Sequence, residues 1–309
     1  MVAQTDKFVR PRDFFATHPV FTHADFVAAH TAGGRSPHTS NSLLAKQVAC
    51  GRLLRVKRGV YATVPTGVQP KDFQPDPSLV AAHLRDDAVV AYHSALAFHG
   101  HAYSIWWRMQ YLTAARVRPF TFRGVEFVGV QAPRAVRDLP DFGGGVQVRP
   151  HAGGHVRVTS LERSLVDLLH APEHGGGWEE IWRSLESVEF FDLAAVIEYA
   201  LRLGSALTAA RVGFFLERHR KEWMVEDRHL EGLARHIPVQ PSYLDRRREP
   251  GKLVHPWNLI VPETVLTERP KVEDAVRAVR ERQGLRVRRV PDDHAGGKWR
   301  LSPTGRQAN

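Results

Sequence analysis

The spacing of apolar and polar residues near the start of the chain predicts two short helices. The first is expected to begin at Thr22, whose hydroxyl can cap it, with Asp25 three residues later in a capping-box position. A glycine pair at residues 33–34 ends that helix. A second helix is expected over residues 37–50, because Ser36 can cap it and proline is tolerated at the first helical position.

The second helix divides into an apolar stripe and a polar side. Leu44 and Val48 are four residues apart and Leu43 adjoins them, so the three share a face that is expected to be buried. The other side carries short, polar or basic residues, among them Asn41. Such side chains fit the major groove of DNA, where asparagine pairs with the edge of adenine.

A basic β-hairpin is expected next, because two β-prone runs flank Arg58 and Gly59. Its cations would contact the DNA backbone. Two helices joined by a glycine turn and followed by such a hairpin are the elements of a winged helix-turn-helix domain. The alternative is a solvated helix beside an ordinary hairpin. The candidate DNA-binding residues are Arg35, His38, Thr39, Asn41, Ser42, Lys46, Arg52, Arg55, Lys57 and Arg58.

A stretch rich in proline, residues 65–76, is typical of a linker between domains. Behind it we expect a helix capped by Asp76 and another helix over residues 92–100. Strands are then expected over residues 109–113 and in a hairpin over residues 120–130.

The following region predicts mainly helices. A capping box over residues 159–162 is expected to begin the first, and Asp192 and Thr208 are expected to cap two later ones. A final extended piece is expected over residues 257–261, and a charged helix over residues 271–282.

Strands grouped before helices, without alternation of the two, indicate an α+β domain. The sequence therefore predicts three regions. They are an N-terminal winged helix-turn-helix domain over residues 1–70, a larger mixed α+β domain over residues 72–267, and a basic, partly disordered tail over residues 268–309.

The distribution of charge changes this picture. The net charge is +10, and residues 1–70 hold 9 Lys and Arg against 3 Asp and Glu, whereas residues 268–309 hold 11 against 6. The region between them is nearly neutral at −1. The positive excess therefore lies on the first region and the tail, as expected if both meet phosphates. A solvated basic tail is the alternative.

The residue sets of usual metal and catalytic sites are not recognisable. Cys50 is the single cysteine, which excludes an intrachain disulfide and is typical of a reducing cytoplasm. Among 17 histidines, His93, His99 and His101 lie close together, but no carboxylate or cysteine stands at a ligand spacing from them. We expect no metal, no cofactor and no enzymatic activity. The alternative from another class is a DNA-targeted nuclease or nucleotidyltransferase.

No apolar run approaches the roughly 18 residues that a membrane span requires. We therefore expect a cytoplasmic protein without a membrane partner.

Two blocks of sequence resemble the AbiEi family, the antitoxins of type IV toxin-antitoxin systems. The first block is the wing, where the matching residues are Leu53, Arg55, Gly59, Val60 and Tyr61. The second begins with Tyr92, Ser94, Ala95, Leu96 and Gly100 and continues over residues 160–169, where Ser164 departs from the usual threonine.

The resemblance implies a winged helix that represses its own promoter by binding repeated half-sites in double-stranded DNA. It further implies a C-terminal domain that opposes a nucleotidyltransferase toxin. An orphan regulator without a toxin partner is the alternative within this family.

Overall fold

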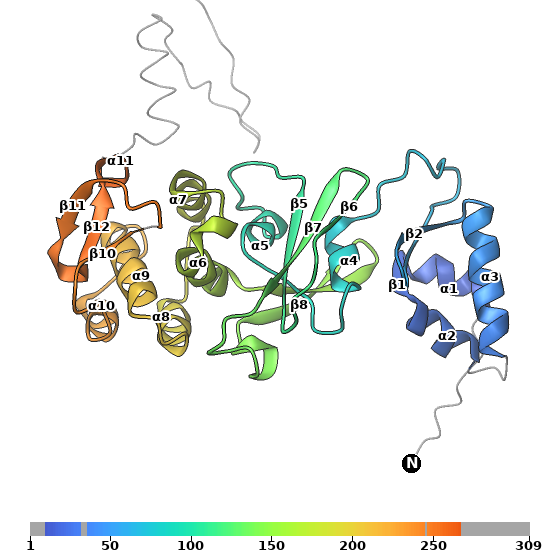
Figure 1. The fold of residues 1–309 in the computed structure, drawn as a ribbon, viewed down its shortest axis with the longest axis horizontal. Helices are drawn as coiled ribbons and strands as arrows, with labels where there is room; N and C mark the ends of the chain where they lie inside the picture. Colours follow the sequence, from blue (N-terminus) through green and yellow to red (C-terminus); the bar gives the residue numbers. More distant parts are fainter. Residues whose placement is uncertain (1–9, 32–35, 245, 267–309) are drawn as a thin grey trace, which may run out of the picture. The chain divides into compact units, whose positions relative to one another are not determined.

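The computed structural model describes residues 10–31, 36–244 and 246–266 (Figure 1). Helices and mixed sheets both occur, so the predicted α+β class is confirmed. The chain divides into two compact units, residues 1–261 and residues 262–309, and each is described by itself. In the second unit the described residues hold the end of β12 and a short helix, α11 (Glu263–Leu266). The predicted charged helix over residues 271–282 lies outside the described residues.

The first unit begins with three helices and a small sheet. In chain order these elements are α1 (Pro11–Thr17), β1 (Val20–Thr22), α2 (His23–Thr31), α3 (Pro37–Ala49), β2 (Leu53–Lys57) and β3 (Val60–Thr63). The strands pair antiparallel in the order β1-β3-β2.

Both predicted helix caps near the N-terminus are confirmed. The backbone N–H of Thr22 donates to a carboxylate oxygen of Asp25 at 2.8 Å, and the N–H of Asp25 donates to the Thr22 hydroxyl at 3.1 Å. The Ser36 hydroxyl accepts from the N–H of His38 at 3.2 Å and caps α3. The glycine turn between α2 and α3 lies outside the described residues.

Two elements of this region are absent from the sequence prediction. Helix α1 buries Phe14 edge-on against Phe21 and Phe26, with ring centroids 5.1 and 5.3 Å apart. Phe21 does not open α2, as predicted, but lies in β1, where it pairs with Tyr61 of β3. This pairing joins residues 40 positions apart, so no local pattern indicates it.

A six-stranded mixed sheet follows, in the order β6-β7-β5-β4-β9-β8. Its strands are β4 (Val89–Val90), β5 (Arg108–Thr113), β6 (Phe120–Phe122), β7 (Val125–Gln131), β8 (Val146–His151) and β9 (Gly154–Thr159). The predicted strand β5 and hairpin β6–β7 are confirmed. Strands β4 and β8 were not predicted.

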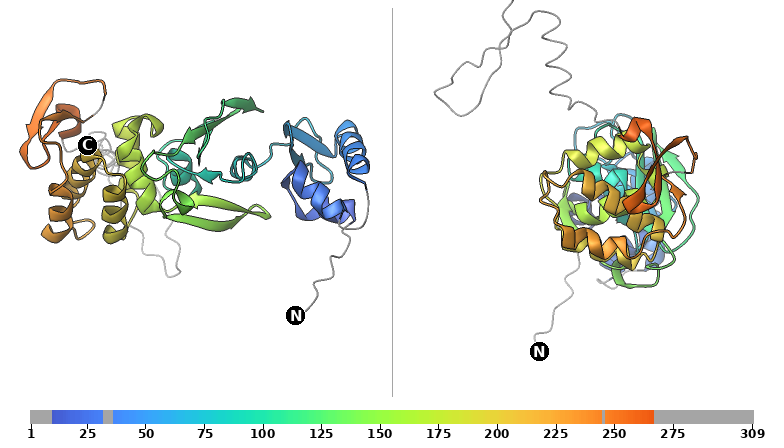
Figure 2. Two further views of the ribbon diagram at one scale, coloured as in Figure 1. Left: turned by 60° about the horizontal axis from the view of Figure 1, so that its bottom comes forward. Right: turned by 90° about the vertical axis from the view of Figure 1, so that its left-hand side faces the viewer.

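Helices make up most of the remainder. They are α4 (Pro77–Ala82), α5 (His93–Phe98), α6 (Leu161–His170), α7 (Trp178–Glu186), α8 (Leu193–Arg202), α9 (Ala206–Arg218) and α10 (Asp227–Ala234). Helices α6, α8, α9 and α10 pack on one another (Figure 2).

Short 3₁₀ turns lie at Pro140–Phe142, Pro172–His174 and His255–Trp257. A second small sheet has the order β10-β12-β11, with β10 (Ser242–Tyr243), β11 (Gly251–Val254) and β12 (Leu259–Pro262). Strand β12 covers most of the predicted extended piece.

The cap predictions for the later helices divide. Asp76 and Asp192 cap α4 and α8 as predicted. Thr208 does not cap α9, because that helix begins two residues earlier and the Ser205 hydroxyl accepts from the N–H of Thr208. Helix α6 is capped by the Ser160 hydroxyl, which accepts from a backbone N–H three residues on, so the predicted box over residues 159–162 is wrong in register.

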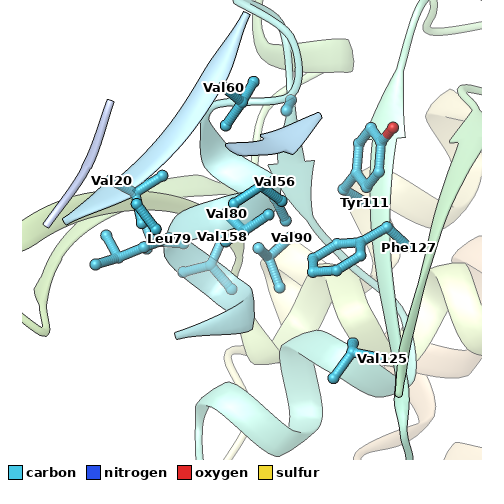
Figure 3. Packing of buried hydrophobic residues seen from close by; sticks show 14 of the residues in the cluster. Val20, Val56, Val60, Leu79, Val80, Val90, Tyr111, Val125, Phe127 and Val158 are labelled. Carbon is cyan, nitrogen blue, oxygen red and sulfur yellow. The ribbon is translucent and has the colours of Figure 1, made fainter. Parts of the chain in front are cut away.

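The two sides of the sheet β1-β3-β2 have different neighbours. One side carries Phe21 and Leu53, which pack among residues of α1, α2 and α3. The other carries Val56, which belongs to the same buried cluster as Leu79 of α4 and Val158 of β9 (Figure 3). The first 63 residues, where described, therefore share a hydrophobic core with the region that follows. The predicted domain boundary between residues 70 and 72 stays a prediction.

Candidate nucleic-acid interface

Helix α3 presents one continuous polar face. Ser40 and Leu44 are buried one helical turn apart, so the residues between and around them point outwards. The exposed residues of α3 include five of the predicted site residues, namely His38, Thr39, Asn41, Ser42 and Lys46.

Two histidines of α2 hold α3 in register. The ring Nδ1 of His30 and the Ser40 hydroxyl are 2.8 Å apart, and both side chains are buried. Nearer the surface, Nε2 of His23 lies 2.5 Å from the side-chain oxygen of Asn41. An amide oxygen can only accept a hydrogen bond, so His23 donates and the amide NH₂ of Asn41 remains turned to the other side.

His23 was not among the predicted site residues. Its partner is 18 positions away on another helix, and nothing in the local sequence indicates that the two side chains meet.

The hairpin β2–β3 supplies the cationic part of the candidate interface. Arg52, Arg55, Lys57 and Arg58 are all exposed. The pairing with β3 shifts between Arg55 and Lys57, and Gly59 turns the hairpin with a φ of +85°, a conformation that favours glycine. Across the residues that the structure describes, none of these four cations forms an ion pair with a carboxylate.

Lys57 is the one of the four with a different contact. Its ammonium lies 4.7 Å from the centroid of the Phe120 ring in β6, at a distance suited to a cation–π interaction. Arg35, the remaining predicted site residue, lies outside the described residues.

A second polar cluster lies in the middle of the chain and is buried. Arg163 and Asp167 of α6 form an ion pair at 3.2 Å, and the Tyr199 hydroxyl donates to the same carboxylate at 2.9 Å. The Arg163 guanidinium also donates to the backbone carbonyls of Asp141 and Gly144. Burial, with Asp167 beside it, raises the pKa of Tyr199 far above its ordinary value. These contacts join α6, α8 and the loop before β8, and we assign them a structural role.

Two searches of the described residues gave negative results. Within residues 10–31, 36–244 and 246–266, no three His, Cys, Asp or Glu side chains come together so that they could hold a metal ion. No helix in these ranges is long and apolar enough to span a membrane.

Comparison with known proteins yields one informative likeness. The structure is similar to the crystal structure of the Rv2827c protein from Mycobacterium tuberculosis, with 17% sequence identity over 84% of this chain and 89% of that chain and a TM-score of 0.47. No protein-family model matches the chain, and no curated protein matches it. The resemblance to AbiEi antitoxins therefore stays a prediction.

Proposed function

We propose that this protein is a cytoplasmic DNA-binding transcriptional repressor and that residues 10–64 are its winged-helix part. The observation that carries the proposal is the pairing of a polar exposed helix face with exposed cations that lack a carboxylate partner among the described residues. Helix α3 would enter the major groove, where Asn41 and its polar neighbours read bases, and Arg55 and Arg58 of the hairpin would bind phosphates.

The order of elements supports the same proposal. A helix, a short strand, two helices and a hairpin, with the first strand paired beside the hairpin, leave one helix projecting from a compact support. The net charge of +6 over residues 1–70 adds a long-range attraction for DNA.

The proposal has a second part that rests on the sequence resemblance alone. If the chain is an AbiEi-type antitoxin, residues 72–267 oppose a nucleotidyltransferase toxin and the DNA site consists of repeated half-sites in the protein's own promoter. A nucleotidyltransferase gene beside the gene for this protein would support this part.

Gel-shift titrations test the first part. The full chain is mixed with a duplex from its own upstream region and with a scrambled duplex of equal length and composition, at physiological salt. We expect the upstream duplex to bind at least about 10³-fold more tightly than the scrambled one. Equal affinity for the two would overturn the repressor proposal.

Variants separate the helix from the hairpin. Asn41→Ala is expected to lower the discrimination between the two duplexes by about 1–3 kcal/mol, because it removes a base contact. Arg58→Ala should weaken both duplexes about equally and reduce the salt slope by about one, because it removes one phosphate contact. Arg228→Ala removes an exposed arginine of α10 and is the matched control, with no expected change. A change of specificity in Arg58→Ala would reverse the assigned roles.

A further inference from the structure

The loop over residues 101–107, between α5 and β5, exposes three large apolar side chains. Tyr103 is 54% exposed, Ile105 is 91% exposed and Trp107 is 71% exposed. The residues between them, Ser104 and Trp106, face the protein and are half-buried. The loop therefore alternates between side chains that anchor it and apolar side chains that face solvent.

Helix α7 holds the inward-facing residues. Glu180 accepts a hydrogen bond from the backbone N–H of Ser104 at 2.9 Å and another from its hydroxyl at 2.8 Å. The indole N–H of Trp106 donates to the same hydroxyl at 3.0 Å. The N–H of Tyr103 donates to the Ser184 hydroxyl at 2.9 Å.

A stacked histidine completes the anchor. The His93 ring lies parallel to the Trp106 ring with centroids 3.8 Å apart, and its Nε2 is 2.9 Å from Glu180. A Cβ atom on Gly176 would stand 2.4 Å from the Trp106 ring, so the glycine provides the space that this indole occupies. The loop is thus ordered before any partner arrives, which reduces the entropy that association would cost.

The charges around the loop are paired within the chain. Arg108 lies 2.8 Å from Glu126, and Arg183 lies 3.4 Å from Glu179 while its guanidinium also covers the Tyr103 ring at 5.1 Å. A nucleic acid would need cations without carboxylate partners, and a strongly charged protein would find no excess of opposite charge here. An apolar centre of tyrosine and tryptophan inside a polar rim is typical of a protein–protein contact.

We propose that the 101–107 loop is the surface through which two copies of this chain associate. In a two-fold symmetric contact the same patch faces itself, so an unpaired charge would repel its own image. The loop satisfies this condition because both of its arginines are neutralised within the chain. The proposal does not depend on DNA binding, although a dimer would match a DNA site of two half-sites.

Sedimentation velocity of the full chain over a concentration series tests this proposal. We expect a reversible monomer–dimer equilibrium. Trp107→Ser and Ile105→Ser should each raise the dimer dissociation constant about thirtyfold or more, because they truncate the centre of the contact. Thermal unfolding followed by circular dichroism should show little change, since both side chains are exposed and make little contact within the monomer.

Two exposed apolar residues outside the loop are matched controls. Phe190 is 65% exposed and Val239 is 95% exposed, so Phe190→Ser and Val239→Ser remove similar apolar surface elsewhere. Both are expected to leave the dissociation constant unchanged. A chain that stays monomeric at every concentration would overturn the proposal. A dimer that tolerates both loop variants, or that the controls weaken equally, would place the contact elsewhere.

Discussion

Asn41 owes its orientation to one side chain of the preceding helix. Because His23 donates to the amide oxygen, the amide NH₂ of Asn41 points away from α2 and can donate to an acceptor on a base edge. Purine N7, guanine O6 and thymine O4 are the acceptors that the major groove offers. His23 would therefore act as a positioning residue for the proposed reading of DNA.

We expect His23→Ala to lower the discrimination at the base pair that Asn41 reads by about 1 kcal/mol, because the amide loses its fixed orientation. His23→Gln should retain most of it, since a glutamine amide can donate the same hydrogen bond. Competition titrations with duplexes substituted at single base pairs measure both effects. The positioning role is wrong if Asn41→Ala loses discrimination and His23→Ala does not.

Several histidines in the middle of the chain are more buried than the chain's polarity suggests. Burial lowers the pKa of His93, His99, His170 and His174 below the ordinary value of about 6.5, although nearby acceptors and carboxylates oppose the shift. Each of these groups binds a proton more readily in the unfolded chain than in the folded one.

The sign of the pH effect follows from this difference. Their contribution to stability is complete well above pH 6.5 and is lost as the pH falls through that value towards the folded-state pKa. We expect the free energy of unfolding to decrease from about pH 7 to about pH 5. Urea titrations at several pH values measure the slope, and His93→Gln should make it shallower, whereas the exposed His38→Gln should not. A stability that rises on acidification would contradict the assignment.

At the scale of elements, success of the sequence reading depends on how local the signal is. The caps Asp76 and Asp192 act on backbone groups two or three residues away, so the residue type and spacing predict them correctly. Thr208 failed because Ser205 offers a hydroxyl one turn earlier and the helix begins there. Strand β4 has two residues and exists only through its pairing with β5 and β9, which a local pattern does not contain.

The candidate interface shows the same division. The polar face of α3 follows from the helical period, because Ser40 and Leu44 mark the buried side. The His23 contact, the Phe120 ring under Lys57 and the outward direction of Trp107 all depend on neighbours distant in sequence. Periodicity therefore predicts which side of an element is exposed, but not which side chain from another element meets it.

At the scale of the whole molecule, the shared core argues against independent behaviour of the first 70 residues. Val56 and Val60 are 6% and 5% exposed, and their buried cluster includes Leu79 and Val158. Removal of residues 1–70 would expose apolar surface on α4 and β9. Loss of such cover costs about 25 cal/mol for each Å² exposed.

We expect a fragment of residues 72–267 to unfold at a lower urea concentration than the full chain. Tryptophan fluorescence measures the same region in both proteins, because the chain has no tryptophan before Trp106. Val56→Ser in the full chain should shift the midpoint in the same direction, since it weakens the same cluster. Identical midpoints for fragment and full chain would show that the shared cluster adds no stability to this region.

One contact of the linker sets the reach of the N-terminal part. The guanidinium of Arg123, in the turn between β6 and β7, donates to the carbonyls of Pro70 and Lys71 at 2.6 and 2.5 Å. With this contact intact, the free tether after β3 is about seven residues, or about 24 Å fully extended, and without it the tether to α4 would be about twice as long. The shorter length is below the roughly 34 Å that separates half-sites one turn of DNA apart. Slack in the linker would then not compensate for a wrong spacing between half-sites, and the distance between the two bodies themselves would determine which operators the protein accepts.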